Sequence, residues 1–327
     1  MYGYEVLHEH IAENLIDNVR KGLAQHAYIF EGDRGVGTDM CARLFAAALV
    51  CETGDSTPCG TCKSCAMAKA KTHPDIYTVS PADGKKNIVV DKIREVVNDA
   101  YTKPYESGKK VYIIAYGDVM NEQAQNAFLK VLEEPPEYAA FIILCENYES
   151  LLQTVRSRCT RIQFPPVSDK KVREYIEAHF PEETEKTKFL VQYAGGVVGN
   201  VEKILGAENF TDLRYESLQK LELLLSPRKT DAFLIAEFFD ENKDDADLIL
   251  TFWQGFLHDI MLIQNDAKKL IQSADFIDRL INFSGKYDER EIINAQEAVL
   301  LAQKMRKRYV SLRTLVLRLA FSIKNNG

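Results

Sequence analysis

The chain has 327 residues, of which 46% are hydrophobic and 27% are charged, an ordinary composition for a globular protein. This length exceeds one ordinary core, so two or three domains are expected. A net charge of -7 argues against nucleic-acid binding over the whole surface. No apolar run reaches the roughly 18 residues that span a bilayer, and the N-terminus lacks the form of a signal peptide. A cytoplasmic chain without a membrane segment is therefore expected.

Strands and helices alternate through the first half of the sequence. A helix over residues 5–25 leads into a strand at 27–30 and a second helix at about 39–50. The same pattern continues as strands at 75–80, 111–115 and 139–145 and helices at 90–102 and 122–134, with Val90, Ile93, Val97 and Tyr101 forming one apolar stripe. This alternation predicts a parallel sheet covered by helices on both faces.

The second half of the sequence reads as helical. Pro165 and Pro166 mark a boundary, after which 166–207 has short helices with turns at Gly195, Gly196 and Gly199. Residues 210–327 contain no convincing strand. Their apolar residues recur at helical spacing, as in Leu218, Leu221 and Leu225 and in Ile249, Trp253, Phe256 and Ile260. A separate all-helical domain is the simplest interpretation.

The segment from Gly32 to Asp39 has the setting of a phosphate-binding loop. It follows an apolar strand, opens a helix and carries Gly32, Gly35 and Gly37, as a turn needs when its backbone N–H groups point at phosphate. Thr38 and Asp39, however, occupy the positions of the expected lysine and hydroxyl residue. The loop thus lacks the cation for the β- and γ-phosphates, and Asp39 adds negative charge where the ligand is already negative.

A second expected nucleotide motif is also altered. In ATPases that carry a phosphate-binding loop, a later strand ends in two acids, one for magnesium and one to polarise water. Here the strand at 111–114 is followed by Ala115 and Tyr116, and the nearest carboxylate, Asp118, lies beyond the strand end. One such motif alone would be explained equally well by chance geometry. Two matched defects at the expected places favour a nucleotide-binding fold that has lost its chemistry.

Four of the seven cysteines fall within fifteen residues, namely Cys51, Cys59, Cys62 and Cys65. In a reducing compartment such a cluster favours a metal site over disulfides. Zinc accepts four thiolates in tetrahedral geometry, and such closed coordination predicts a structural role. An iron–sulfur cluster is the alternative. Cys41, Cys145 and Cys159 read as small core residues.

Charge is unevenly distributed towards the C-terminus. Residues 302–327 carry seven basic residues and no acid: Lys304, Arg306, Lys307, Arg308, Arg313, Arg318 and Lys324. A solvated helix face is the simpler interpretation, with an acidic partner or DNA phosphate as the alternative. The acidic stretch from Asp240 to Asp247 is interpreted as a solvated loop.

These motifs occur together in one order that resembles a known family. The order is Gln25-His26-Ala27-Tyr28, the altered loop, the cysteine insertion, the run from Asn126 to Pro136 that includes Glu133-Glu134-Pro135-Pro136, and Ser157-Arg158-Cys159. It resembles the clamp-loader branch of the AAA+ ATPases, over roughly residues 20–165. Beyond 165 the resemblance rests on domain layout.

The resemblance implies an architecture and partners. It implies an α/β parallel-sheet AAA+ core at 1–165 with a zinc module at about 51–65, a small helical lid at 166–207, and an all-α collar at 208–327. Through such collars five subunits form a ring. The implied partners are ATP-hydrolysing motor subunits and a delta subunit, with the sliding clamp and primer-template DNA reached through the complex.

The resemblance also implies roles for single residues. Motor subunits of this family keep the loop lysine and the paired acids, so Thr38, Asp39, Ala115 and Tyr116 imply a subunit that neither binds nor hydrolyses ATP. The turn at 195–200 lacks the arginine that motor subunits place nearby. Arg158 of the Ser-Arg-Cys motif is implied to reach the ATP of the next subunit as an arginine finger, for which a permanently charged fork suits.

Three alternatives stay open at this stage. Arg158 could be a structural arginine that pairs with an acid. The chain could be a working motor subunit, which the altered motifs oppose. It could also be a stand-alone zinc module that binds nucleic acid, but the aromatic residues expected around the cysteines are missing.

Overall fold

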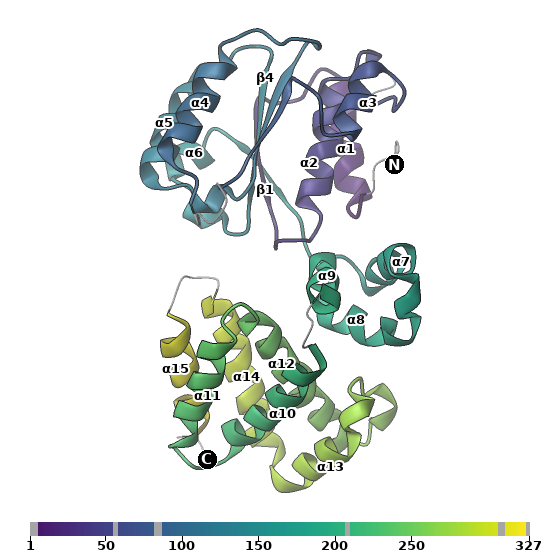
Figure 1. The fold of residues 1–327 in the computed structure, drawn as a ribbon, viewed down its shortest axis with the longest axis vertical. Helices are drawn as coiled ribbons and strands as arrows, with labels where there is room; N and C mark the ends of the chain where they lie inside the picture. The colour runs from purple at the N-terminus through teal and green to yellow at the C-terminus, as the bar shows by residue number, and fades with distance from the viewer. Residues whose placement is uncertain (1–5, 55–57, 82–86, 207–209, 307–310, 325–327) are drawn as a thin grey trace. The chain divides into compact units, whose positions relative to one another are not determined.

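A computed structural model describes residues 6–54, 58–81, 87–206, 210–306 and 311–324 of the chain. The chain divides into two compact units, Met1–Tyr175 with Gly196–Gly199 and Ile176–Gly195 with Asn200–Gly327. The first contains a sheet with helices, and the described part of the second is helical (Figure 1). The predicted division into a core, a lid and a collar stays a prediction.

The first unit is built on a five-stranded sheet of order β2-β3-β4-β1-β5. Its strands are β1 (Ala27–Glu31), β2 (Ile76–Val79), β3 (Lys110–Ile114), β4 (Ala139–Cys145) and β5 (Thr160–Gln163). All four neighbouring pairs are parallel, as the alternating pattern predicts. The carboxyl ends of the strands therefore share one edge of the sheet, and their amino ends share the opposite edge.

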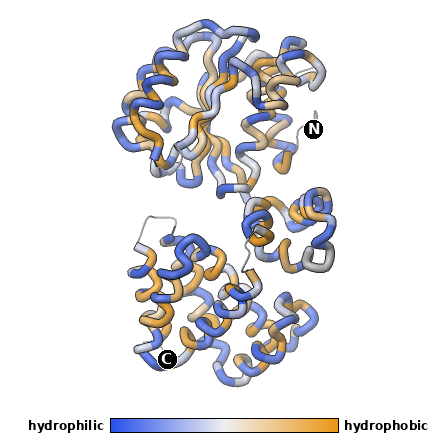
Figure 2. Tube along the Cα trace, in the orientation of Figure 1, coloured by the Kyte–Doolittle hydropathy of each residue, from blue (hydrophilic) through white to orange (hydrophobic). Residues whose placement is uncertain are grey.

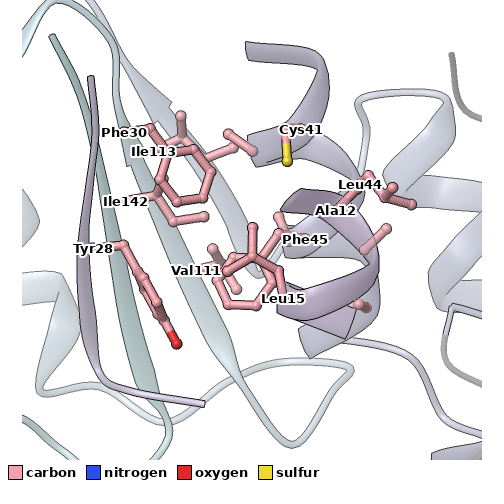
Figure 3. Packing of buried hydrophobic residues seen from close by; sticks show 14 of the residues in the cluster. Ala12, Leu15, Tyr28, Phe30, Cys41, Leu44, Phe45, Val111, Ile113 and Ile142 are labelled. Atoms are coloured by element: carbon pink, nitrogen blue, oxygen red, sulfur yellow. The ribbon is translucent and has the colours of Figure 1, made fainter. Parts of the chain in front are cut away.

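Helices cover both faces of this sheet (Figure 1). The helices of the first unit are α1 (Glu9–Arg20), α2 (Thr38–Leu49), α3 (Lys63–Lys69), α4 (Val90–Ala100), α5 (Glu122–Glu133), α6 (Gln153–Arg156) and the start of α7 (Asp169–His179). On one face Phe45 of α2 packs against Tyr28, Phe30 and Ile142 of the strands (Figure 3). On the other face, residues of α4 and α5 pack against strand residues in a second hydrophobic cluster.

The central strands are apolar along their whole length. All five residues of β3 and all seven of β4 are buried, and the strands run as a hydrophobic band between mixed helices (Figure 2). Residues of a strand covered on both faces need no polar alternation, which is why these strands read as continuous apolar runs in the sequence.

The second unit consists of helices in all of its described parts. They are the rest of α7, α8 (Thr187–Ala194), α9 (Val198–Gly206) from Asn200 on, α10 (Phe210–Leu225), α11 (Asp231–Glu241), α12 (Ala246–Gln264), α13 (Ile277–Lys286), α14 (Glu289–Arg306) and α15 (Leu312–Lys324). Both predicted apolar stripes are buried. Among the described residues, α12 alone has the length and hydropathy to cross a membrane, but 61% of that window is buried, as in a core helix.

Three local expectations differ from the structure. The first helix is shorter than 5–25, because Gly22 takes a positive φ of 66° just after it. Tyr101 does not continue the apolar stripe: it follows the last residue of α4 and is 44% exposed. Strand β5, which follows the Ser-Arg-Cys motif, was not anticipated, because its residues are mostly polar and exposed.

Several basic residues near the C-terminus make contacts within the chain, unlike the residues of a solvated helix face. Lys324 is buried, and its Nζ donates to the carbonyl oxygens of Leu223 at 2.7 Å and Ser226 at 2.6 Å. Arg313 pairs with Asp240, and Arg306 pairs with Asp247 at 3.3 Å. The basic segment and the acidic stretch thus neutralise each other in part, so neither is simply a solvated surface. Lys307 and Arg308 lie outside the described residues.

Candidate functional site

The phosphate-loop-like turn connects β1 to α2 at the carboxyl edge of the sheet. Gly35 has a φ of +86° and Gly37 a φ of +109°, a region that favours glycine. Gly37 stands directly before Thr38, the first residue of α2. The backbone thus has the predicted strand-turn-helix form, with the N-terminus of a twelve-residue helix behind the turn.

Other parts of the chain pack directly onto this turn. The Gly199 N–H donates to the Gly35 carbonyl oxygen at 3.0 Å, and a Cβ at Gly35 would lie 2.6 Å from the Cα of Gly199. The His8 Nε2 lies 2.9 Å from the Val36 carbonyl oxygen. A Cβ at Gly37 would lie 3.2 Å from Leu7. Burial lowers the pKa of His8, an effect that the charge of Lys171 reinforces.

The two replaced positions point to structural roles. Thr38 begins α2, and the carboxylate of Asp39 accepts from Arg43 one helical turn later, with Nε to Oδ1 at 3.1 Å. Such a pair at i and i+4 stabilises the helix itself. Asp39 also places a negative charge at the helix N-terminus, where the helix dipole favours it.

At the strand ends the structure places Tyr116 and Arg34 together. Tyr116 has a positive φ of 62° and caps the short 3-10 turn Gly117–Val119. The Arg34 guanidinium lies 4.3 Å from the centre of the Tyr116 ring, and its Nε lies 3.1 Å from Glu146 Oε1. Asp118 is half-buried, and burial raises its pKa. Sequence reasoning missed Arg34, since its partners follow two different strands.

The four clustered cysteines come together in space. Their sulfur atoms all lie within 4.8 Å of one another, and Cys59 Sγ is 4.0 Å from Cys65 Sγ. Tetrahedral zinc with bonds of about 2.3 Å requires sulfur atoms about 3.8 Å apart. The cluster can therefore hold one metal ion after small adjustments. Cys41 and Cys145 are buried as predicted, and Cys159 is half-buried.

The backbone around the cysteines is arranged for thiolates. The N–H groups of Thr61 and Cys62 point at Cys59 Sγ at 3.4 and 3.2 Å, and the Cys65 N–H points at Cys62 Sγ at 3.3 Å. Gly60 makes this turn possible with a φ of +74°. Hydrogen bonds from the Thr61 hydroxyl and backbone lower the pKa of Cys59 to about 5. Burial raises the pKa of Cys65.

Arg158 lies between α6 and β5, and its guanidinium is held by its own chain. Nη2 pairs with Glu133 Oε1 at 2.7 Å. Nη1 donates to the Thr154 carbonyl oxygen at 2.8 Å and to Ser157 Oγ at 3.3 Å. The side chain is 34% exposed. Arg158 therefore has an acidic partner, Glu133, as the alternative of a structural arginine requires, and this pair lies at the surface.

Arg158 and the phosphate-loop-like turn lie at opposite edges of the sheet. Thr160 of β5 is in register with Tyr28 of β1, and both strands run towards Glu31 and the turn that follows it. Arg158 precedes β5, so the two sites are separated by about 13 Å or more along the strands. Arg158 cannot reach a phosphate bound at this turn.

Two sequence families match the chain. The family described as DNA polymerase III, delta subunit, matches residues 7–168, and the one described as DNA polymerase III, delta subunit, C terminal, matches residues 208–312. The chain belongs to the DNA polymerase III delta subunit family. The first match ends close to Pro165, and the second covers most of the helical unit. The chain accordingly has the two parts of this DNA polymerase III subunit family, a parallel-sheet core and a helical C-terminal region.

Curated relatives agree with this assignment along most of the chain. DNA polymerase III subunit delta' of Bacillus subtilis is 28% identical over 308 residues, which are 91% of this chain and 90% of the relative. The delta' subunit of Haemophilus influenzae is 27% identical, over 88% of this chain and 85% of the relative. A DNA polymerase III gamma subunit, from Buchnera aphidicola, is 28% identical over 80% of this chain and 77% of the relative. Among solved structures, a DNA polymerase III gamma subunit-related protein from Thermotoga maritima aligns over 98% of this chain and 99% of its own chain. Its TM-score is 0.42 and its sequence identity is 17%.

Proposed function

We propose that this chain is a non-catalytic subunit of the DNA polymerase III clamp loader that supplies Arg158 to the ATP site of a neighbouring subunit. In this role it works within a five-membered ring with motor subunits and a delta subunit. The helical lid at 166–207 and the collar at 208–327 would join it to that ring. The ring would load the sliding clamp onto primed DNA in the cytoplasm.

The observation that carries the proposal is the separation of Arg158 from the chain's own phosphate-loop-like turn. A surface arginine at the amino edge of the sheet cannot act on a nucleotide at the carboxyl edge. This separation supports a role of Arg158 towards a group outside its own chain. Guanidinium suits phosphate because it forks onto two oxygens and stays charged.

The lack of ATP chemistry rests on residues at the turn and the strand ends. Thr38 offers no cation for phosphate, and Ala115 and Tyr116 offer no ligand for magnesium. Gly199 and His8 also occupy the surface of the turn with backbone and ring atoms. These features support a subunit that depends on its neighbours for hydrolysis. The alternative, a working motor subunit, would have to bind and hydrolyse ATP without the lysine and the magnesium ligands and with its turn covered.

Zinc is the metal that we propose for the cysteine cluster. Cys51, Cys59, Cys62 and Cys65 would hold it, and it would supply a fixed tetrahedral link between the end of α2 and the start of α3. No open position remains for a substrate when four thiolates bind one ion. The site therefore belongs to the fold of the module. Elemental analysis separates zinc from the iron–sulfur alternative.

The test of the finger role replaces Arg158 by alanine in the reconstituted assembly. DNA-stimulated ATP turnover at the neighbouring site should fall on the order of a thousandfold, since fingers supplied in trans contribute about 10³ or more. Assembly and the melting temperature of the free variant should stay unchanged. Arg158→Lys should rescue poorly, because an ammonium keeps the charge but not the fork.

Arg20→Ala is the matched control for this test. Arg20 also forms a surface ion pair, with Asp17 at 3.3 Å, and its side chain is 32% exposed. Its loss should leave turnover unchanged. Normal turnover of an intact assembly that carries Arg158→Ala would refute the finger role. A large fall in melting temperature would favour the structural role of Arg158 instead.

A further inference from the structure

The inference concerns the contacts that hold Arg158 in the free chain. A guanidinium carries two N–H groups on Nη1, two on Nη2 and one on Nε. Both N–H groups of Nη1 have acceptors in the same chain, the Thr154 carbonyl oxygen and Ser157 Oγ. Nη2 gives one to Glu133. The Nη edge of the fork is therefore largely engaged before any neighbour arrives.

A forked grip on phosphate needs two adjacent N–H groups that point the same way. With both N–H groups of Nη1 engaged, gripping through the Nη edge requires at least one internal contact to open. The carboxylate of Glu133, 2.7 Å from Nη2, also offsets the positive charge that a phosphate would meet. Glu133 thus competes with an incoming phosphate for the same group.

We propose that Glu133 is a positioning residue that holds Arg158 away from the neighbour's nucleotide until the assembled ring draws it across. This inference rests on the proposed finger role of Arg158. Glu133 is the last residue of α5, and α5 is fixed at its other end by Asn121, whose side chain accepts from the Ala124 N–H. The carboxylate is therefore presented by the C-terminal end of a capped helix.

The strength of the contact sets the size of the expected effect. Glu133 is 49% exposed and Arg158 is 34% exposed, and exposed ion pairs stabilise by about 0.2–1 kcal/mol, a factor of about 1.4 to 5 in an equilibrium. A contact of this strength can keep Arg158 withdrawn in the resting ring. A contact this weak can also be exchanged for a phosphate of the neighbouring subunit.

The experiment replaces Glu133 by glutamine in the full assembly with the motor subunits. Glutamine keeps the shape and one acceptor but removes the charge. ATP turnover without DNA should rise about two- to five-fold, in line with the strength of an exposed pair. The kcat with saturating primed DNA should stay as in the unchanged assembly. Glu134→Gln removes the same charge one residue further along and should alter neither rate.

Variant combinations separate the possible failures. If Glu133 acts through Arg158, the double variant with Glu133→Gln and Arg158→Ala should match Arg158→Ala alone. Equal DNA-independent rates for Glu133→Gln and Glu134→Gln, while Arg158→Ala is defective, would overturn this inference and leave the finger role standing. A fall in both rates with a lowered melting temperature would overturn it in favour of a structural pair. Normal turnover by Arg158→Ala would remove the proposed function itself.

Discussion

Gly35 shows how one residue can carry two separate constraints. Its positive φ of 86° disfavours any side chain, and its Cα side faces Gly199 with no room for a methyl group. The backbone bond from the Gly199 N–H fixes this approach at 3.0 Å. Other glycines of the chain carry the first constraint alone. Gly22, for example, has a φ of +66° and open space around it.

This difference gives a stability prediction. Gly22→Ala should cost about 1–2 kcal/mol, the usual penalty of a left-handed conformation for a residue with a Cβ. Gly35→Ala should cost more, about 2–4 kcal/mol, because strain at a special φ adds to overpacking. Urea unfolding followed by circular dichroism measures both. Equal losses of unfolding free energy for the two variants would mean that the backbone at Gly199 moves away from the added methyl group at no cost.

At the scale of elements, the cysteine module joins two helices through one possible metal. Cys51 follows α2, whereas Cys62 caps the N-terminus of α3 and Cys65 lies within it. The helix α3 has only seven residues, too few to be stable alone in water. We infer that metal binding and the folding of this segment are one event.

Replacement of one ligand should therefore unfold the module locally. Cys62→Ser should reduce the metal content from one ion per chain to nearly none and open the segment around α3 to protease. Cys159→Ser, at a cysteine outside the cluster, should keep the metal. The sole tryptophan, Trp253, reports on the other unit, where it is fully buried and its Nε1 donates to the Ser217 carbonyl oxygen at 2.8 Å.

The unfolding transition that Trp253 fluorescence reports should consequently have the same midpoint temperature in Cys62→Ser and Cys159→Ser, because the helical unit has its own core. A metal content near zero in the unchanged protein, purified without chelators, would contradict the site. A large shift of the Trp253 transition in Cys62→Ser would show instead that the two units unfold together.

For the whole molecule, the proposed loss of ATP chemistry rests on segments that lie far apart in the sequence. The altered turn follows β1, the missing acids follow β3, and the residue that covers the turn, Gly199, comes from more than 150 residues further along the chain. Catalysis of phosphoryl transfer depends on positioning all of these parts at once. Restoring one of them should therefore not restore the activity.

A double reversion tests this reasoning. The variant with Thr38→Lys and Asp39→Thr regains the lysine and hydroxyl of a phosphate loop. It should neither bind ATP in the micromolar range nor hydrolyse it, since Ala115 and Tyr116 still offer no magnesium ligand. Calorimetry of the isolated chain, with a motor subunit of the same assembly as the positive control, measures this. Turnover by the variant would place the whole defect in the turn.

Local chemistry along the sequence determined much of this protein. The apolar strands, the glycine turn, the missing lysine and acids and the four cysteines are each defined by neighbouring residues, so periodicity and spacing sufficed. The parallel sheet followed from the order of the elements. The four cysteines lie close in sequence, and their meeting in space was predictable for that reason.

Contacts between segments far apart in the sequence were decided only by the tertiary structure. No local pattern relates Arg158 to Glu133, Arg34 to Glu146, or Gly199 to Gly35, because the fold brings together segments that are separated in the sequence. The same holds for Lys110, which begins a buried strand and is kept there by Asp99 at 2.9 Å. Burial of a charge needs a partner, and the fold alone supplies it.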